Sequence, residues 1–142
     1  MIYTKETKKA LKLCFEAHKD QLDKSGMPYV FHPFHLAEQM ETEDTVVAAL
    51  LHDVVEDTDY TFEDLVSMGF SEEVITALRL LTHDDATPYM EYVAAVKSNP
   101  IAKAVKIADL KHNSDTTRLE VIDERAAKRV EKYASALALL GE

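Results

Sequence analysis

Polar side chains interrupt the most apolar stretch of this 142-residue sequence. The apolar run over residues 46–51 leads directly into His52-Asp53, and Glu56-Asp57 follow on the next turn. Because residues four apart share one side of a helix, the spacing predicts that the imidazole and the carboxylates face the same way. Such a group at the end of an apolar helix is costly to desolvate without a cation or other partners. The cluster therefore indicates either a divalent metal site or a solvated helix end.

Two distant segments offer further ligands of the same kinds. His32 follows an apolar tripeptide at the start of a predicted helix, and Asp109 follows an apolar stretch in another. Alone, a histidine in such a place is more typical of packing or capping, and a carboxylate there is usually solvated. Combined with His52 and Asp53, they would form a mixed imidazole and carboxylate site, which suits Mn, Fe or Zn. His35 lies one turn after His32 and is an alternative ligand.

The elements that position these residues are predicted to be helices. Helical periodicity, capping residues and the few Gly and Pro predict helices over residues 4–22, 32–40, 45–55, 61–69, 71–81, 88–96, 99–111 and 120–140. No segment has the alternation and turn residues of paired β-strands. The helix over residues 45–55 is apolar almost all round and should lie at the centre. The sequence thus predicts one compact all-α domain over residues 1–142, whose central helix carries the His-Asp pair.

Composition and charge limit the possible partners. Sixteen Lys and Arg oppose 26 Asp and Glu, which gives a net charge of −10. This excess argues against nucleic acid and anionic membrane surfaces as partners, because both are bound through clustered basic residues. No apolar run approaches the roughly 18 residues of a membrane helix, and the N-terminus lacks the apolar core of a signal peptide. We therefore expect a cytoplasmic protein, whose oligomeric state the sequence does not predict.

Two further features have ordinary structural interpretations. Cys14 lies in an apolar run near the N-terminus, which favours a buried, reduced thiol. The last predicted helix interleaves basic and acidic residues at helical spacing, namely Arg125, Lys128, Arg129 and Lys132 with Glu124 and Glu131. Such a pattern is typical of a solvated, ion-paired face.

The order of the candidate ligands, one His, a His-Asp pair and a distant Asp, resembles the H…HD…D pattern of the HD-domain metal-dependent phosphohydrolases. Longer matches occur at residues 24–33 (KSGMPYVFHP), 48–58 (AALLHDVVEDT) and 105–109 (VKIAD), followed by His112-Asn113. Together they resemble the hydrolase domain of RelA/SpoT proteins and, at this length, the stand-alone small alarmone hydrolases of the Mesh type. The similarity covers roughly residues 11–113, and no synthetase domain is expected after Glu142.

The resemblance implies a reaction, a metal and a set of roles. The family hydrolyses the 3′-pyrophosphate of (p)ppGpp, a small anionic nucleotide, to pyrophosphate and GDP or GTP. The implied metal, Mn²⁺ in that family, would be held by His32, His52, Asp53 and Asp109. Glu56 and Asp57 would position and activate the attacking water. The implied nucleotide contacts are Lys24, Ser25 and Asn113.

The sequence departs from the family pattern near two of these positions. Asp23 precedes Lys24, where the family commonly has a basic residue that packs on the guanine. After Asp109, the run LKHNSD displaces the family's basic residues. We therefore keep two alternatives: an HD phosphohydrolase acting on another nucleotide or nucleotide-like pyrophosphate, and a non-catalytic nucleotide-sensing module.

Overall fold

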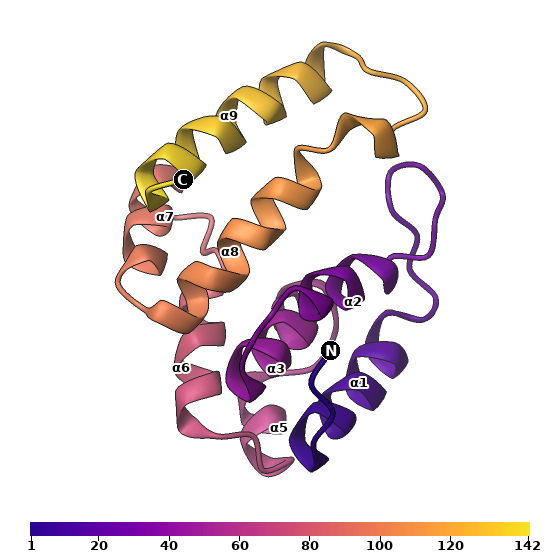
Figure 1. Cartoon of the computed structure of the whole chain (residues 1–142), viewed down its shortest axis with the longest axis vertical. Helices are drawn as coiled ribbons and strands as arrows, with labels where there is room; N and C mark the ends of the chain where they lie inside the picture. Colours follow the sequence, from indigo (N-terminus) through magenta and orange to yellow (C-terminus); the bar gives the residue numbers. More distant parts are fainter.

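All of residues 1–142 are described by the computed structural model, whose regular elements are helices. In chain order these are α1 (Lys5–His18), α2 (Phe31–Glu38), α3 (Glu43–Leu51), α4 (Val54–Asp57), α5 (Phe62–Ser67), α6 (Glu72–Leu81), α7 (Tyr89–Lys97), α8 (Pro100–Asn113), the 3-10 turn η1 (Thr116–Arg118) and α9 (Glu124–Leu140), as Figure 1 shows. The predicted all-α class is confirmed, and every predicted helix has a counterpart. No helix is both long enough and apolar enough to cross a membrane.

The centre of the fold is α3, as its sequence predicts. Thr42 caps the helix, because its side chain accepts the backbone N–H of Thr45 at 3.2 Å. Every residue from Thr45 to Leu51 is buried, so this length of helix has no solvent-facing side. The helix packs against α1, α2, α6 and α8 (Figure 1). A fully buried Val or Leu side chain contributes about 1.5–3 kcal/mol, so α3 supplies a large part of the hydrophobic stabilisation.

The helix predicted over residues 45–55 is wrong in one respect, because it ends at Leu51. His52 turns back so that its Nδ1 donates a hydrogen bond to the carbonyl oxygen of Ala49 at 2.7 Å. Asp53 has non-helical backbone angles (φ −109°, ψ 3°), and the single turn α4 follows it. The expectation that one continuous helix aligns all the polar groups is therefore incorrect. The break instead leaves the His52 ring buried at the end of α3.

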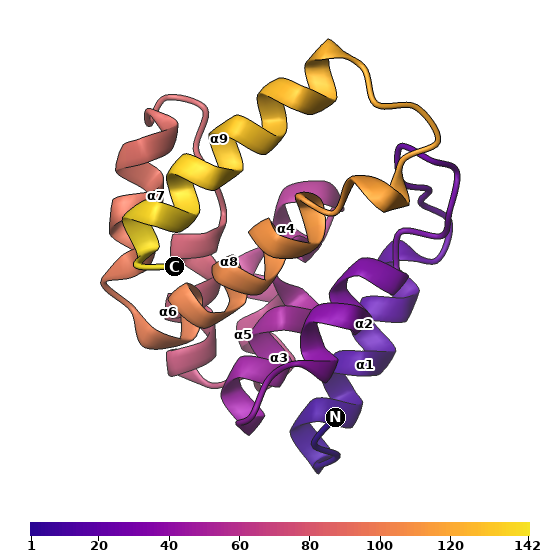
Figure 2. The ribbon, with the colours of Figure 1, turned by 45° about the horizontal axis from the view of Figure 1, so that its top comes forward.

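The C-terminal part of the chain packs over the N-terminal helices. Helix α8 packs on α2, α3 and α6, and α9 packs on α7 and α8 (Figure 2). Between α8 and α9, η1 lies beside the loop that follows α1, where Ser25 Oγ donates to the carbonyl oxygen of Arg118 at 2.8 Å. The loop after α1, the end of α8 and the first half of α9 therefore surround one space.

Cys14 is buried in α1 without a disulfide partner, as predicted. Burial and the Asp53 carboxylate raise the pKa of its thiol to about 12. A thiol that stays protonated at neutral pH is a poor nucleophile and a poor metal ligand, so Cys14 acts as a core residue.

Candidate metal centre

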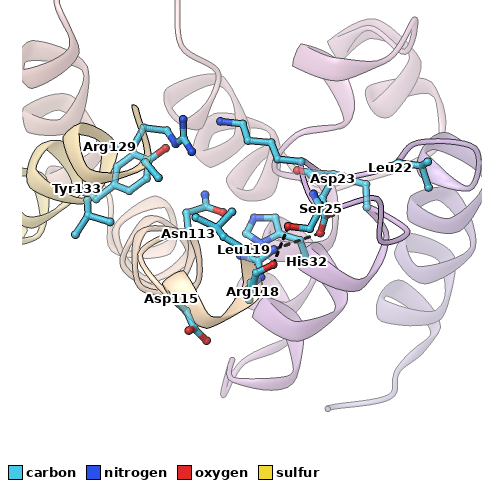
Figure 3. A pocket seen from close by; sticks show the side chains of 14 residues that line it. Leu22, Asp23, Ser25, His32, Asn113, Asp115, Arg118, Leu119, Arg129 and Tyr133 are labelled. Atoms are coloured by element: carbon cyan, nitrogen blue, oxygen red, sulfur yellow. Dashed lines mark hydrogen bonds and ion pairs between the residues drawn. The ribbon is translucent and has the colours of Figure 1, made fainter. Parts of the chain in front are cut away.

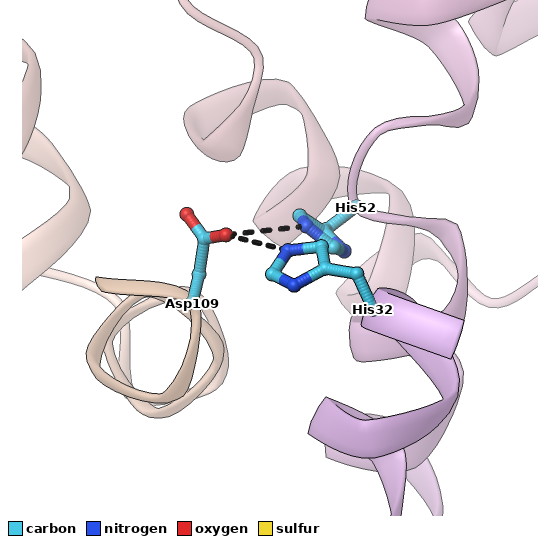
Figure 4. A group of neighbouring side chains, drawn as sticks. All are labelled: His32, His52 and Asp109. Carbon is cyan, nitrogen blue, oxygen red and sulfur yellow. Dashed lines mark hydrogen bonds and ion pairs between the residues drawn. The ribbon is translucent and has the colours of Figure 1, made fainter. Parts of the chain in front are cut away.

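Three of the four predicted ligands converge at one buried point (Figure 4). His32 comes from α2, His52 from the end of α3 and Asp109 from α8, and one ligand atom of each lies within 4.8 Å of the others. Nε2 of His32 lies 2.9 Å from Oδ1 of Asp109, and Nε2 of His52 lies 3.6 Å from the same oxygen. The fold thus assembles these side chains from segments that lie far apart in the sequence.

The fourth predicted ligand, Asp53, lies beside this group rather than within it. Its Oδ2 is 3.0 Å from Nε2 of His52 and accepts a hydrogen bond from the hydroxyl of Tyr29. Burial opposes ionisation of Asp53, but the His52 ring holds the pKa of that carboxyl group below its usual value. Asp53 is therefore a charged group facing the same His52 nitrogen as Asp109.

The His52 ring indicates that this donor set fits a cation. Because Nδ1 donates to the Ala49 carbonyl, a neutral ring presents the lone pair of Nε2. That nitrogen faces the Asp53 and Asp109 carboxylates and has no hydrogen bond of acceptable geometry. A divalent cation would satisfy these facing lone pairs. Without one, the ring takes a second proton: although burial opposes its charge, the two carboxylates raise the pKa of His52 well above its usual value.

Lys106, which was not among the predicted site residues, holds Asp109 from its other side. Its Nζ donates to Oδ2 of Asp109 at 2.9 Å and lies 5.2 Å from the centre of the Tyr92 ring. Burial opposes ionisation of Asp109, but Lys106 and the two histidines hold the pKa of that carboxyl group well below its usual range. The only signal in the sequence was the three-residue spacing of Lys106 and Asp109 on a helix. Such partners fix the orientation of a metal ligand.

His32 is oriented by a second histidine, His112. Their Nδ1 atoms lie 2.7 Å apart, so one ring donates to the other. Burial and the Arg118 charge lower the pKa of His112 to about 4, which keeps this ring neutral at physiological pH. His35, the alternative ligand, packs its ring against His112 at 4.2 Å between centroids and is itself exposed. His32, not His35, therefore belongs to the buried cluster.

Glu56 and Asp57 lie on α4, directly after the His-Asp pair, and both are exposed. Partial burial and the Asp53 charge raise the pKa of each carboxyl group. Gln21 Nε2 donates to the backbone carbonyl of Asp57 at 3.1 Å, which ties α4 to the segment after α1. Gln21 is held in turn by His18, whose Nδ1 lies 2.8 Å from Gln21 Oε1. A carboxylate with a raised pKa is suited to accept a proton near neutral pH.

A cavity of about 320 Å³ opens beside the cluster, and all the predicted nucleotide contacts line it (Figure 3). His32 reaches the cavity from the cluster, Lys24 and Ser25 from the loop after α1, and Asn113 from the end of α8. Asn113 Nδ2 also donates to Oδ1 of Asp109 at 3.0 Å, which links the cavity to the candidate ligands. The volume lies within the range of roughly 300–1,000 Å³ that is usual for small-molecule sites.

The cavity wall opposite that loop comes from α9 and was not predicted. Arg129 and Tyr133, one helical turn apart, both line it (Figure 3). The helical spacing of the charges in this segment predicted a solvated, ion-paired face for Arg129. Lys128 does pair there with Glu124 at 3.6 Å, but Arg129 makes no ion pair within 4.0 Å. The four-residue spacing of Arg129 and Tyr133 was the only signal, and it does not reveal which side of a helix faces a cavity.

Asp23, which departs from the family pattern, shapes the loop. Its Oδ1 accepts the backbone N–H groups of Ser25 and Met27 at 2.9 and 3.0 Å. Its Oδ2 lies 3.9 Å from Nη2 of Arg118, whose Nη1 donates to the carbonyl oxygen of His112 at 2.8 Å. This pair holds the loop against the end of α8. Both residues line the cavity, so the cation at this point comes from Arg118 rather than from residue 23.

Comparisons with known proteins give the same family. The sequence profile of the HD domain matches residues 10–136. The protein MESH1 of Danio rerio, named a guanosine-3′,5′-bis(diphosphate) 3′-pyrophosphohydrolase, is 34% identical over 131 residues, which cover 83% of this chain and 72% of that protein. A protein of Aquifex aeolicus with the same enzyme name is 31% identical over 92% of this chain, but the chain spans only 20% of its length.

The fold also has a match among solved structures. A structure described as a metazoan ortholog of SpoT that hydrolyzes ppGpp superposes with a TM-score of 0.78 and 25% sequence identity. The match covers 99% of this chain and 88% of the other chain. The resemblance therefore extends over the whole helical fold, including the three segments that carry the candidate ligands.

Proposed function

Because this chain belongs to the HD-domain family and matches MESH1 over most of its length, we propose that it hydrolyses the 3′-pyrophosphate of (p)ppGpp. The products are pyrophosphate and GDP or GTP. The observation that carries this proposal is a buried His32, His52 and Asp109 cluster that opens into a cavity of nucleotide size. A cytoplasmic site of action, which we also propose, agrees with a nucleotide substrate.

We propose Mn²⁺ as the metal, with His32, His52 and Asp109 as ligands and Asp53 as the fourth. Imidazole and carboxylate donors suit this ion. When bound, it would polarise a phosphoryl oxygen and lower the pKa of the attacking water. Lys106 and His112 would keep Asp109 and His32 in the orientation that binding requires.

Glu56 and Asp57 are the groups that receive the proton of the attacking water. Their raised pKa values support this role, because a stronger base takes a proton more readily at neutral pH. The water oxygen bonds to the phosphorus next to the 3′ oxygen. The bond between that phosphorus and the 3′ oxygen breaks, and the 3′ oxygen leaves with the proton that the Glu56 and Asp57 pair took from the water.

Lys24, Ser25 and Asn113 are proposed to hold the nucleotide in the cavity. Burial and the Arg129 charge lower the pKa of Lys24, so two cations stand close together there. Two neighbouring cations that form no ion pair suit a phosphate-bearing ligand. Arg118, on the same cavity, adds a third.

Asp23 supports a second candidate, an HD phosphohydrolase for a different nucleotide pyrophosphate. Its carboxylate is engaged by the loop backbone and by Arg118, so residue 23 offers no cation to pack on a guanine base. Base selectivity must then come from other cavity residues. The two candidates share the metal centre and differ only in substrate.

A substrate panel separates the candidates. Purified protein with Mn²⁺ is incubated with ppGpp, its adenine counterpart and simple nucleoside diphosphates, and pyrophosphate release is measured. We expect release from ppGpp above all. Turnover of another pyrophosphate while ppGpp is spared would favour the second candidate, and tight binding of ppGpp without turnover would indicate a sensing module. No pyrophosphate over a wide range of enzyme concentration would refute the proposal.

A further inference from the structure

A second cavity adjoins the first on the side away from the metal centre. It has a volume of about 420 Å³ and shares Lys24, Ser25, Leu119 and Arg129 with the first cavity. Beyond these shared residues it extends along the start of α9, where Arg125 lines it together with Glu120, Val121 and Asp123. The two cavities are thus neighbours that meet at Lys24 and Arg129.

The two cavities differ in chemical character. The first is rich in apolar and aromatic side chains, including Leu22, Tyr29, Val130 and Tyr133, and ends at the metal centre. Most residues of the second are charged or polar. Apolar and aromatic walls suit a base and a ribose, whereas a cationic space suits phosphate groups.

The cations of the second cavity form no close ion pairs. Lys24, Arg125 and Arg129 make no ion pair within 4.0 Å, although the chain has 26 acidic residues. The Asp123 carboxylate caps α9 by accepting the backbone N–H of Ala126 at 2.9 Å, and this bond together with the nearby charges of Arg129 and Arg125 lowers its pKa. Three cations outnumber the two carboxylates around this space, Glu120 and Asp123, and none of the three forms an ion pair, which indicates a site for an anionic ligand.

We propose that the second cavity binds the 5′-phosphate chain of the nucleotide, with Arg125 as the outermost cation. The inference rests on the proposed function, which places the 3′-pyrophosphate at the metal centre. With the base and ribose in the first cavity, the 5′-phosphates extend past Lys24 and Arg129 towards Arg125. The end of a chain of three 5′-phosphates lies closer to Arg125 than the end of a chain of two. The site therefore favours pppGpp over ppGpp.

Charge reversal at Arg125 tests this proposal. We expect Arg125→Glu to lower the ratio of kcat/KM for pppGpp to that for ppGpp roughly fivefold, the size of one exposed ion pair. Arg125 is exposed, so the fold does not depend on it. Lys128→Glu is the matched control, because Lys128 undergoes the same charge change on the same helix, pairs with Glu124 and does not line the cavity. A ratio that is unchanged in Arg125→Glu, or equally lowered in Lys128→Glu, would overturn the proposal.

A binding measurement keeps this test separate from the proposed reaction. GTP has the same 5′-triphosphate as pppGpp, and GDP the same 5′-diphosphate as ppGpp, but neither has a 3′-pyrophosphate to be hydrolysed. Calorimetry can therefore compare their binding affinities directly. We expect GTP to bind the wild type more tightly than GDP, and the difference to be lost in Arg125→Glu but kept in Lys128→Glu. Equal affinities for GTP and GDP in the wild type would overturn the proposal. A GTP preference in a protein that does not hydrolyse ppGpp would support the second cavity while refuting the proposed function.

Discussion

At the scale of single residues, the two oxygens of Asp109 have different partners. Oδ2 accepts the hydrogen bond of Lys106, and Oδ1 faces the His32 and His52 rings. Because the hydrogen bond to Oδ2 restricts rotation of the carboxylate, Oδ1 stays directed at the two histidines. A half-buried lysine beside three candidate metal ligands is unusual, because its charge opposes that of a metal. Its value lies in orienting Asp109 and in keeping it ionised.

Replacing Lys106 should therefore weaken metal binding. We expect Lys106→Met, which keeps the packing against Tyr92, to reduce Mn²⁺ affinity about 10–100-fold, the usual effect of losing a partner that orients a ligand. A Mn²⁺ titration followed by electron paramagnetic resonance measures it. Lys103→Met, on the same helix one turn earlier, should bind Mn²⁺ like the wild type. Equal affinities in both variants would show that Lys106 does not orient Asp109.

The proposed division between ligand and base predicts two different phenotypes for neighbouring carboxylates. We expect Asp53→Ala to lose bound metal, and Glu56→Ala to keep it while kcat falls about 10²–10⁴-fold, the usual effect of removing a general base. Metal content by mass spectrometry and ppGpp turnover are measured on the same samples. A metal-free Glu56→Ala protein would contradict the assigned roles.

At the scale of elements, the one-turn helix α4 carries both proposed bases and has few anchors. One is the hydrogen bond from Gln21 Nε2 to the Asp57 carbonyl, supported by His18. The Gln21 side chain contacts the backbone of α4 and none of the proposed metal ligands. We therefore expect this hydrogen bond to fix the position of Glu56 and Asp57 without affecting metal binding. Gln21 is thus a positioning residue for the proposed bases.

Removing this anchor should slow turnover without loss of metal. We expect Gln21→Leu to lower kcat roughly fivefold, in line with about 1 kcal/mol for one hydrogen bond, with Mn²⁺ content unchanged. Gln39→Leu removes a similar bond, from its side chain to the His35 carbonyl, at a distance from the cavity. This control should keep full kcat. Loss of metal from Gln21→Leu would mean that the contact supports the ligands instead.

The elements also show how far sequence reasoning extends. The all-round apolar run of α3 and the order of the candidate ligands were enough to predict a central helix and the residues that converge beside it. The break after Leu51 was not predictable, because no Gly or Pro stands between His52 and Asp57 to signal it. Arg129 and Lys106 were missed for a related reason. Charged residues at helical spacing look alike whether a helix turns them to solvent or to a cavity.

At the scale of the whole molecule, we propose that residues 1–142 form one domain around α3. Its net charge of −10 contrasts with the unpaired cations around the two cavities. An acidic surface repels long polyanions, whereas a local cationic space attracts a small one. The sequence argument against nucleic acid as a partner thus agrees with a small, highly charged nucleotide as substrate.

The metal-free protein should become less stable as the pH rises. Although burial opposes the charge on His52, Asp53 and Asp109 raise its pKa above the ordinary value of 6.5. The protonated ring therefore stabilises the folded state fully below about pH 6.5, and this contribution is lost as the pH rises through the raised pKa. Mn²⁺ replaces the proton, so the stabilisation it provides should increase over the same range.

Thermal melts with EDTA and with Mn²⁺, from about pH 6 upwards, check this linkage. The Tm in EDTA should fall as the pH rises, and the difference between the Tm in Mn²⁺ and the Tm in EDTA should increase. His52→Gln should flatten both trends, because it removes the titrating ring. A gap that narrows at high pH would contradict the assignment of His52 as a ligand.

The most direct test of the proposed function is the metal dependence of ppGpp hydrolysis with the products identified. Protein stripped with EDTA is dialysed and titrated with Mn²⁺ while phosphorus NMR follows ppGpp. We predict no turnover in the stripped protein, recovery that tracks the binding of a single Mn²⁺ per chain, and pyrophosphate with GDP as the products. Turnover that persists without a divalent metal, or inorganic phosphate released in place of pyrophosphate, would contradict it.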